Sequence, residues 1–213
     1  MNKANDFEIN KEKLYWENLT KQGYRPPGYE GVEKFHLIQP IWLEKYLQPT
    51  KEKVMFEVGC GWGKQTRLFA DMFKTVIAED VSATMIKLCK AECTDKSNIV
   101  YCEYPEQLKT LTMKFDCTWS YGVLQYCTDE IILKMQEDIL PHMNADARFL
   151  WQFAMFRYDI PDQKTTKENG RSDIMRNPHE VKALLEQGGF VMDGYEFTLC
   201  PTLQVWAYGH KRG

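Results

Sequence analysis

The chain has 213 residues, of which 44% are hydrophobic and 13% aromatic, so it can bury the core of one folded domain and is not globally disordered. Its net charge of -3 and its lack of any block of Lys and Arg do not favour a dedicated nucleic-acid binder. No window approaches the roughly 18 apolar residues of a membrane span, and the polar N-terminus lacks the apolar stretch of a secretory signal. We therefore expect a cytoplasmic protein with no membrane partner.

Residues 1–50 are expected to form a helical segment that is interrupted by a loop. Apolar residues at helical spacing begin the segment, and the run GYRPPGY at 23–29 breaks it because Gly and Pro favour turns. A helical apolar pattern resumes over 35–47, with Pro40 as a boundary or kink.

After residue 50, apolar runs alternate with helical patterns. Buried parallel strands are predicted at 54–58, 75–78, 98–102, 115–120 and 148–156. Helices are predicted between them at 64–73, 83–93 and 129–142. This alternation implies right-handed crossovers and a parallel sheet.

The C-terminal part departs from the alternation. A long polar loop is expected over 157–171, and a helix over 180–187 ends at a glycine pair. Two β-like runs, 190–199 and 203–208, are close enough in sequence to pair antiparallel. The sheet is therefore expected to be mixed, with an antiparallel edge at its C-terminal end.

Seven cysteines occur, none of them in a C-x-x-C pair. Most lie in apolar runs, which indicates small buried thiols in a reducing compartment. Cys89 and Cys93 are four residues apart on a predicted helix, but no second pair of Cys or His ligands accompanies them. No metal site is therefore expected.

The strongest chemical signal is the run EVGCGWG at 57–63, which ends the first predicted strand and opens a helix. Its glycines allow a sharp turn and let a ligand approach the backbone. The helix N-terminus beyond it favours a negative group, such as the carboxylate of an amino-acid moiety. The spacing is not the G-x-G-x-x-G of dinucleotide sites, and Gln65 stands where a P-loop needs Ser or Thr.

Asp80, at the end of the second predicted strand, is the second signal. A carboxylate in this place can accept both hydroxyls of a ribose. Alternatively, Asp80 caps the helix that follows Ser82, but ribose binding is favoured because a glycine turn precedes it. The neighbouring Glu79 is expected to be solvated.

These features resemble the class I S-adenosylmethionine-dependent methyltransferases. The run at 57–63 matches their first motif, acidic-x-Gly-x-Gly-x-Gly, and DVSATMI at 80–86 resembles their second. FDCTWSYGVL at 115–124 and the stretch at 176–190 are similar to their fourth strand and final helix, so the resemblance covers about 53–208.

The resemblance implies an α/β fold, a Rossmann-like three-layer sandwich with a mostly parallel seven-stranded sheet and an antiparallel C-terminal edge strand. It implies one methyltransferase domain over 1–213, in which 1–50 is a helical lid segment and 51–213 the Rossmann-like core. The implied cofactor is S-adenosyl-L-methionine. The residues expected to bind it are Glu57, Gly59, Cys60, Gly61, Asp80, Val81, Met85, Glu103, Tyr104, Ser120 and Tyr121.

Within this set, the resemblance gives each part of the cofactor its own residues. Gly59 and Gly61 would line the methionine part, Glu57 would order the amino group, and Asp80 would hold the ribose. The adenine would lie against Val81 or Met85, and the backbone near Ser120 and Tyr121 would face the methionine and the sulfonium.

Two positions depart from the family's pattern. The family often has an Asp after the third strand that contacts the adenine amino group, but here Tyr104 occupies that place. Glu103 or the Tyr104 backbone would have to substitute. After the fourth strand many members that act on small molecules carry a His, where this chain has Tyr126. A proton-shuttling His is therefore absent at that place.

Methyl transfer from a sulfonium mainly requires positioning and desolvation. A general base is needed only where the acceptor must lose a proton early, as a hydroxyl usually does. The catalytic candidates are His36 and Tyr24, in the N-terminal segment expected to cover the site. Arg157 or Arg171, in the polar loop, is a candidate clamp for an anionic acceptor, although simple solvation is favoured for both.

We expect methyl transfer to a small-molecule hydroxyl or amine, because the chain is near the minimum size for this fold plus a short lid. A methyltransferase acting on RNA or protein is one alternative. DNA amino-methyltransferases are disfavoured, since SYGV at 120–123 replaces their Asn/Asp-Pro-Pro-Tyr/Phe run. A non-catalytic binding module is the other alternative. The acceptor and the oligomeric state stay open.

Overall fold

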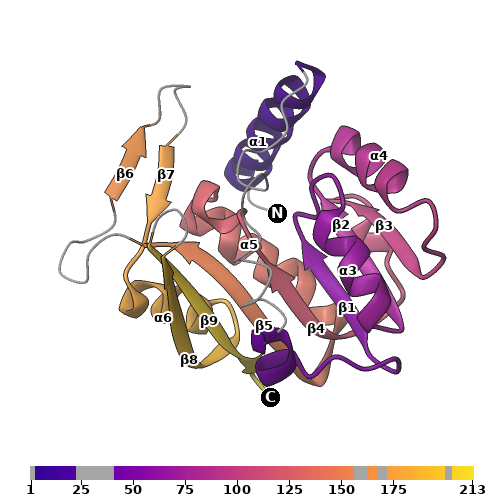
Figure 1. The fold of residues 1–213 in the computed structure, drawn as a ribbon. Coiled ribbons are helices and arrows are strands. Elements are labelled where there is room, and N and C mark those ends of the chain that lie inside the picture. The colour runs from indigo at the N-terminus through magenta and orange to yellow at the C-terminus, as the bar shows by residue number, and fades with distance from the viewer. Residues whose placement is uncertain (1–2, 23–40, 156–162, 167–171, 200–202) are drawn as a thin grey trace.

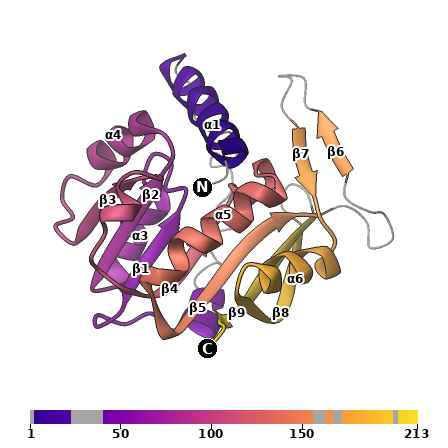
Figure 2. The same cartoon turned by 180° about the vertical axis from the view of Figure 1, so that it is seen from behind.

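The computed structural model describes residues 3–22, 41–155, 163–166, 172–199 and 203–213. A seven-stranded sheet with the order β3-β2-β1-β4-β5-β9-β8 runs through it. Helices α3 and α4 cover one face (Figure 1), and α5 and α6 cover the other (Figure 2). The expected Rossmann-like sandwich with a mostly parallel sheet is confirmed.

Strands β1 to β5 form the parallel part of the sheet. Their bounds are β1 Val54–Val58, β2 Thr75–Asp80, β3 Ile99–Glu103, β4 Phe115–Ser120 and β5 Met143–Ala154. β1 lies between β2 and β4, β3 pairs with β2, and β5 pairs with β4, all in parallel. β5 begins earlier than predicted, because Met143 pairs with Phe115 across a register shift that the apolar pattern does not reveal.

The helices lie close to their predicted positions. The α-helices are α1 Lys3–Lys21, α3 Lys64–Met72, α4 Ala83–Glu92, α5 Asp129–Ile139 and α6 Pro178–Gln187. Shorter turns are η1 Leu43–Leu47, η2 Leu108–Thr110, η3 Leu124–Tyr126 and η4 Leu140–His142. Side-chain caps fix where three of these helices begin: Ser82 caps α4, Thr128 caps α5, and Asn177 forms a capping box at α6.

The C-terminal strands make the sheet mixed, as predicted. β9 (Leu203–Lys211) pairs antiparallel with both β5 and β8 (Phe190–Leu199). β8 forms the outer edge, and the antiparallel strand β9 lies one place inside it.

The expectation of an unstructured polar loop after the fifth strand is wrong in part. β6 (Gln163–Thr166) pairs antiparallel with β7 (Ser172–Met175) in a separate two-stranded ribbon beyond the end of β5 (Figure 1). The ribbon pairs the backbone groups of this polar segment, and the β-branched Thr165 and Thr166 favour a strand. Arg157 and Arg171 lie outside the described residues.

The core has two layers, because successive side chains of each strand point to opposite faces. Phe56 and Trp151 pack against α5 and α6, whereas Met55 and Trp119 pack against α3 and η1. The cysteines that the structure describes are buried. Within the described ranges, no helix combines the length and the apolar character needed to cross a membrane.

Candidate functional site

The glycine-rich turn and the tip of β2 meet at the carboxyl ends of the strands. The turn 59–63 connects β1 to α3, and its Gly61 N–H donates a hydrogen bond to Asp80 Oδ2 at 2.9 Å. The Cys60 N–H donates to the Glu79 carbonyl oxygen at 2.7 Å. The two motifs singled out in the sequence are therefore in direct contact.

The three positions of this turn require glycine for different structural reasons. Gly59, Gly61 and Gly63 have φ angles of 71°, 54° and 95°, in the left-handed region that favours glycine. A Cβ at Gly59 would lie 2.2 Å from Val123 Cγ2, and one at Gly63 would lie 2.9 Å from Cys89 Sγ. A Cβ at Gly61 would meet no heavy atom within 4 Å. Gly61 is therefore the glycine that faces open space.

Asp80 is not the N-cap of α4. Ser82 is the cap, and its Oγ accepts a hydrogen bond from the Met85 N–H at 3.2 Å. Asp80 instead accepts bonds from the backbone N–H groups of Ser82 and Gly61, one on each oxygen and each at 2.9 Å. Burial raises the pKa of Asp80 to about 6, although these two bonds oppose the shift. Each carboxylate oxygen keeps a lone pair that can accept a further hydrogen bond from a ligand hydroxyl.

Two more carboxylates are buried beside Asp80. Glu57 accepts a hydrogen bond at 2.6 Å from the Thr66 hydroxyl of α3, and burial raises its pKa well above the usual value. Glu79 accepts one from the Gly59 N–H at 3.4 Å. The expectation that Glu79 is solvated is wrong: it is 5% exposed, because its strand is flanked by β1 and β3.

The side chain of Tyr104 points into the core. Its hydroxyl donates to Asp138 Oδ2 of α5 at 2.9 Å, and burial raises its pKa. Its backbone N–H donates to the Asp80 carbonyl oxygen at 3.1 Å. Glu103 accepts a hydrogen bond from Lys13 at 2.5 Å. Of the two expected adenine contacts, therefore, the Tyr104 backbone N–H is bonded to Asp80 and Glu103 is paired with α1.

At the end of β4, one expected site residue has an unused polar group. Ser120 is fully buried, and its Oγ has no hydrogen-bond partner among the described residues. The Tyr121 ring stacks on Trp206, with ring centroids 5.5 Å apart, so its side chain packs on the α3 face.

The apolar residues expected to bind the cofactor lie close in sequence to the glycine turn and to Asp80. Met85 lies in the first turn of α4 and is 3% exposed, and Val81 packs against the core on the α5 face. Cys60 is buried against Cys89 of α4 and against Cys93, the residue that follows this helix. The structure thus brings the expected cofactor residues of β1, β2 and β4 to one edge of the sheet.

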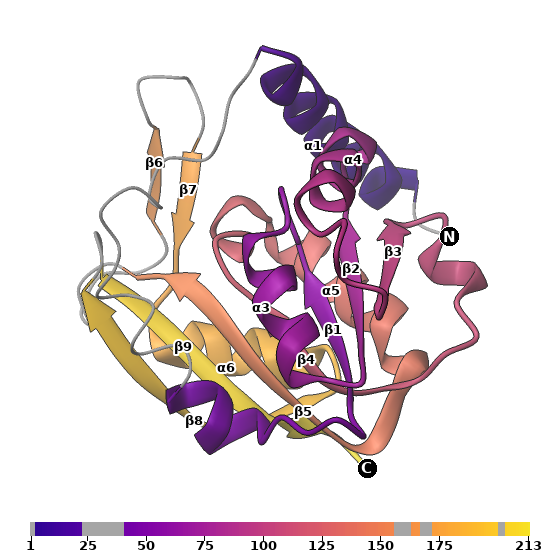
Figure 3. The same cartoon turned by 45° about the vertical axis from the view of Figure 1, so that its right-hand side comes forward.

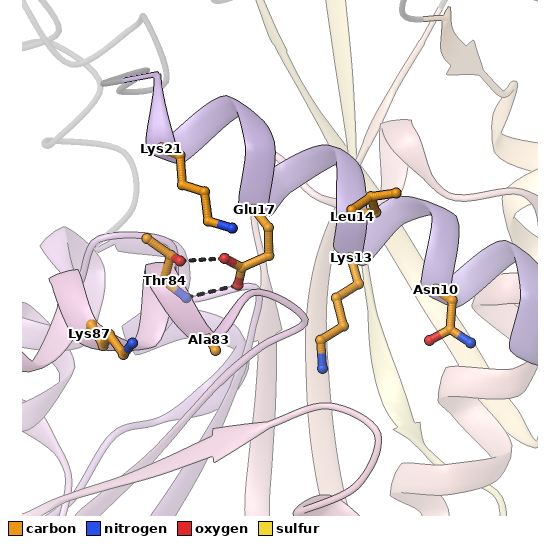
Figure 4. A pocket seen from close by; sticks show the side chains of 8 residues that line it. All are labelled: Asn10, Lys13, Leu14, Glu17, Lys21, Ala83, Thr84 and Lys87. Atoms are coloured by element: carbon orange, nitrogen blue, oxygen red, sulfur yellow. Dashed lines mark hydrogen bonds between the residues drawn. The ribbon is translucent and has the colours of Figure 1, made fainter.

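Helix α1 lies above these strand ends, between α4 and α5 (Figure 3). The Glu17 carboxylate accepts hydrogen bonds from the Thr84 N–H at 3.0 Å and from the Thr84 hydroxyl (Figure 4). It also accepts one from the Ser82 hydroxyl at 2.9 Å. On the other side, the Trp16 ring meets Tyr126 edge-on, with centroids 5.6 Å apart. The helix is therefore attached both to the start of α4 and to the turn after β4.

An open groove lies beside the Glu17 contact, between α1 and α4 (Figure 4). Its volume is about 520 Å³, and three lysines, Lys13, Lys21 and Lys87, contribute to its lining. Neither the glycine turn nor Asp80 lines it. The groove is thus adjacent to the candidate site and separate from it.

Glu17→Ala is expected to loosen α1. The change removes the carboxylate that accepts from Ser82 and Thr84, at a cost of about 1 kcal/mol. Amide hydrogen exchange along α1 should become roughly fivefold faster. Asn18→Ala, on the exposed side of the same helix, is the control and should leave exchange unchanged. Equal exchange in Glu17→Ala and the parent protein would contradict the assignment.

The contribution of Glu17 is also expected to depend on pH. Burial acts to raise its pKa, but the hydrogen bonds from Thr84 and Ser82 outweigh this effect, and the pKa is lowered from 4.5. A lowered carboxyl pKa stabilises the docked helix above pH 4.5, and this stabilisation is lost as the pH falls through the folded-state pKa. Exchange in the parent protein should therefore approach that of the variant in acid.

Buried polar side chains hold the turn after β4. The Arg176 guanidinium donates to the carbonyl oxygens of Leu124 and Cys127, at 3.3 and 2.9 Å, and to Asp129. The Gln152 Oε1 atom accepts a hydrogen bond from the Gly122 N–H at 2.8 Å. These contacts fix the segment that follows Ser120 in one conformation.

The sequence interpretation missed Glu17, Gln152 and Arg176. Lys13, Glu17 and Lys21 recur at intervals of four residues, which is a signal for one charged helix face. Gln152 and Arg176 carry no local signal, because their partners are distant in the chain. The two catalytic candidates, Tyr24 and His36, lie outside the described residues.

Comparison with known proteins finds a match over the part of the chain that carries the glycine turn, Asp80 and Ser120. A family model described as a methyltransferase domain matches residues 56–139. No curated protein matches the chain. The sequence identities to the solved structures below are low, so these similarities establish the fold alone.

Three of the similar solved structures span most of the chain. Magnesium protoporphyrin IX methyltransferase from Synechocystis PCC 6803, with bound S-adenosylhomocysteine, has a TM-score of 0.68 at 14% identity and covers 95% of this chain and 99% of its own. The complex of DhpI with S-adenosylhomocysteine has a TM-score of 0.65 at 16% identity, with 96% and 97% coverage. The 1,6-didemethyltoxoflavin-N1-methyltransferase from Burkholderia thailandensis has a TM-score of 0.65 at 17% identity, with 86% coverage of each chain.

Proposed function

We propose that the chain is a class I S-adenosylmethionine-dependent methyltransferase and that it transfers the methyl group of this cofactor to a small-molecule acceptor. The observation that carries the proposal is the meeting of Gly61 and Asp80. Gly61 faces open space, and the carboxylate that receives its N–H has acceptor positions left for hydroxyl groups. This arrangement suits a ligand that carries a ribose.

The residues at the strand ends fit the cofactor in chemistry as well as in position. Gly59 and Gly61 would hold its methionine part through the backbone, Asp80 would hold its ribose, and Met85 would lie against its adenine. Glu57 would order its amino group, and the unused hydroxyl of Ser120 supports a polar ligand at the end of β4. When bound, the cofactor supplies a methyl group already activated on a sulfonium.

The protein's own contribution is to position the reactants and exclude water. In our proposal α1 is part of a lid formed by residues 1–50, over a core formed by residues 51–213 of a single domain. Its contacts with the start of α4 and with Tyr126 support this role. The turn after β4, held by Gln152 and Arg176, would form a fixed wall of the acceptor site.

A small-molecule acceptor, with a hydroxyl or an amine, is supported by the activities for which similar solved structures are named. They include a 1,6-didemethyltoxoflavin-N1-methyltransferase, a magnesium protoporphyrin IX methyltransferase and a mitomycin 7-O-methyltransferase. An amine acceptor needs no early loss of a proton, whereas a hydroxyl acceptor usually needs a general base. His36 remains our candidate for that base, and Tyr24 our candidate for a side chain that closes over the cofactor.

Calorimetry followed by an acceptor screen tests the proposal. The protein should bind S-adenosylmethionine, and a library of small hydroxyl and amine compounds should include one that stimulates release of S-adenosylhomocysteine. Absence of binding at millimolar cofactor would overturn the proposal. Binding with release stimulated only by RNA or protein would reassign the acceptor class.

A further inference from the structure

One row of side chains crosses the sheet just below the glycine-rich turn. Strand pairing places Cys102, Glu79, Val58, Ser120 and Trp151 side by side on β3, β2, β1, β4 and β5. Laterally paired residues of a parallel sheet point to the same face. Since Cys102, Val58 and Trp151 belong to the core on the α5 face, Glu79 and Ser120 also point to that face, on either side of Val58.

Both polar members of this row are poorly satisfied. Among the described residues, the hydrogen bond found for the Glu79 carboxylate is the 3.4 Å contact with the Gly59 N–H, and the Ser120 hydroxyl has none. Both side chains are buried. Burial of a carboxylate without strong partners is costly, so a purely structural role favours an apolar residue at position 79.

The titratable groups that act electrostatically with Glu79 do not neutralise it. Asp80 lies next to it on β2, Glu57 lies on β1, and Cys102 and Tyr104 lie at the end of β3. None of these groups is cationic. The Lys13 ammonium of α1 is hydrogen-bonded to Glu103. Among the residues that the structure describes, Glu79 is therefore a buried acid without a cationic partner, and its natural complement is a positive charge.

We propose that Glu79 and Ser120 form a polar floor beneath the cofactor, and that Glu79 makes the site select S-adenosylmethionine over its product S-adenosylhomocysteine. This inference rests on the proposed function. The cofactor carries a sulfonium charge that the product, a neutral thioether, has lost. A fixed carboxylate in a poorly solvated site distinguishes the two, because Coulomb interactions are stronger there than in water. Selection against the product favours its release after transfer.

The stability that the buried Glu79 carboxylate costs gives a first test, in which the melting temperature of the ligand-free protein is measured at two pH values. Burial, followed by the charge of Asp80, raises the pKa of Glu79 well above its usual value, against the opposing bond from Gly59. A raised carboxyl pKa means that Glu79 lowers the stability of the fold as the pH rises from the usual carboxyl pKa to the raised one. Glu79→Leu should therefore raise the melting temperature more at pH 8 than at pH 5. A lower melting temperature at both pH values would identify Glu79 as structural.

Calorimetry provides the decisive test, with S-adenosylmethionine and S-adenosylhomocysteine as probes. Glu79→Gln keeps the shape of the side chain and removes its charge. It should weaken binding of the cofactor roughly tenfold while leaving binding of the product almost unchanged. Glu52→Gln, which removes an exposed charge before β1, is the matched control and should leave both affinities as they are.

Proton release gives a readout that a structural role does not change. A bound sulfonium lowers the pKa of Glu79, so binding of the cofactor at neutral pH should release more protons than binding of the product. Heats measured in phosphate and Tris buffers report this difference, which should vanish in Glu79→Gln. Parent protein that binds both ligands with equal proton release, or Glu79→Gln with an unchanged affinity ratio, would overturn the inference. Parent protein that binds neither ligand would instead overturn the proposed function.

Discussion

Asp80→Ala is expected to weaken binding of S-adenosylmethionine by roughly 1–3 kcal/mol, the usual cost of losing a hydrogen bond to a charged group. The same carboxylate receives the Gly61 N–H, so the change also removes the contact that ties the glycine turn to β2. Calorimetry gives the affinity, and a thermal melt shows whether the variant is folded. Unchanged affinity in a folded Asp80→Ala protein would remove Asp80 from the site.

The effect of Asp80→Ala should grow with pH. Because burial raises the pKa of Asp80 to about 6, the carboxylate of the free protein is largely protonated below that value and ionised above it. The ionised form accepts hydrogen bonds from hydroxyl groups more strongly. Affinity of the parent protein should therefore fall as the pH decreases through 6, while that of the variant stays flat over the same range.

A matched variant separates this role from helix capping. Ser82→Ala removes the N-cap of α4, which is expected to cost about 1 kcal/mol of stability, together with one of the three hydrogen bonds that Glu17 of α1 accepts. It leaves the carboxylate of Asp80 and its bond from Gly61 in place. A lower melting temperature with nearly parent-like affinity is the expected result. Equal losses of affinity in the two variants would mean that the start of α4, and not the carboxylate, determines binding.

The sequence predicts best those features that depend on neighbouring residues. The bounds of β1 and β4 agree with the predicted runs at 54–58 and 115–120, because buried parallel strands leave short apolar runs. The contact of the glycine turn with Asp80 also follows from local signals. Each motif ends a strand, and parallel strands bring their carboxyl ends to one edge of the sheet.

Features that depend on distant contacts escape such reasoning. Glu17 bonds to Thr84, which lies 67 residues further along the chain, and Tyr104 reaches Asp138, 34 residues away. The burial of Glu79 follows from its position between two neighbouring strands and not from its residue type. A polar residue inside an apolar run is ambiguous until the sheet order is known.

Residues that break a local rule gather at the strand ends of this protein. Glu57 and Glu79 are carboxylates in buried strands. Each costs stability in the free protein, and each lies where the proposed cofactor would offset that cost. This is the pattern expected where folding and ligand binding make different demands on the same residues.

Gly61→Val is expected to abolish detectable cofactor binding while the protein still folds. A Cβ at this position meets no heavy atom within 4 Å, so the valine side chain would occupy the space assigned to the ligand. A steric cost of about 3 kcal/mol, or roughly a 100-fold loss of affinity, follows from forcing two groups into one volume. The φ of 54° adds backbone strain of about 1–2 kcal/mol.

Gly61→Ala isolates the steric effect from that strain. Alanine also carries a left-handed penalty, smaller than that of the β-branched valine, but has no branches to fill the space. Both variants should therefore melt at lower temperatures than the parent, whereas only the valine should lose binding beyond detection by calorimetry. Retained binding in Gly61→Val would place the cofactor elsewhere. Equal losses in both variants would show that the conformation of the turn, and not the space beside it, sets the affinity.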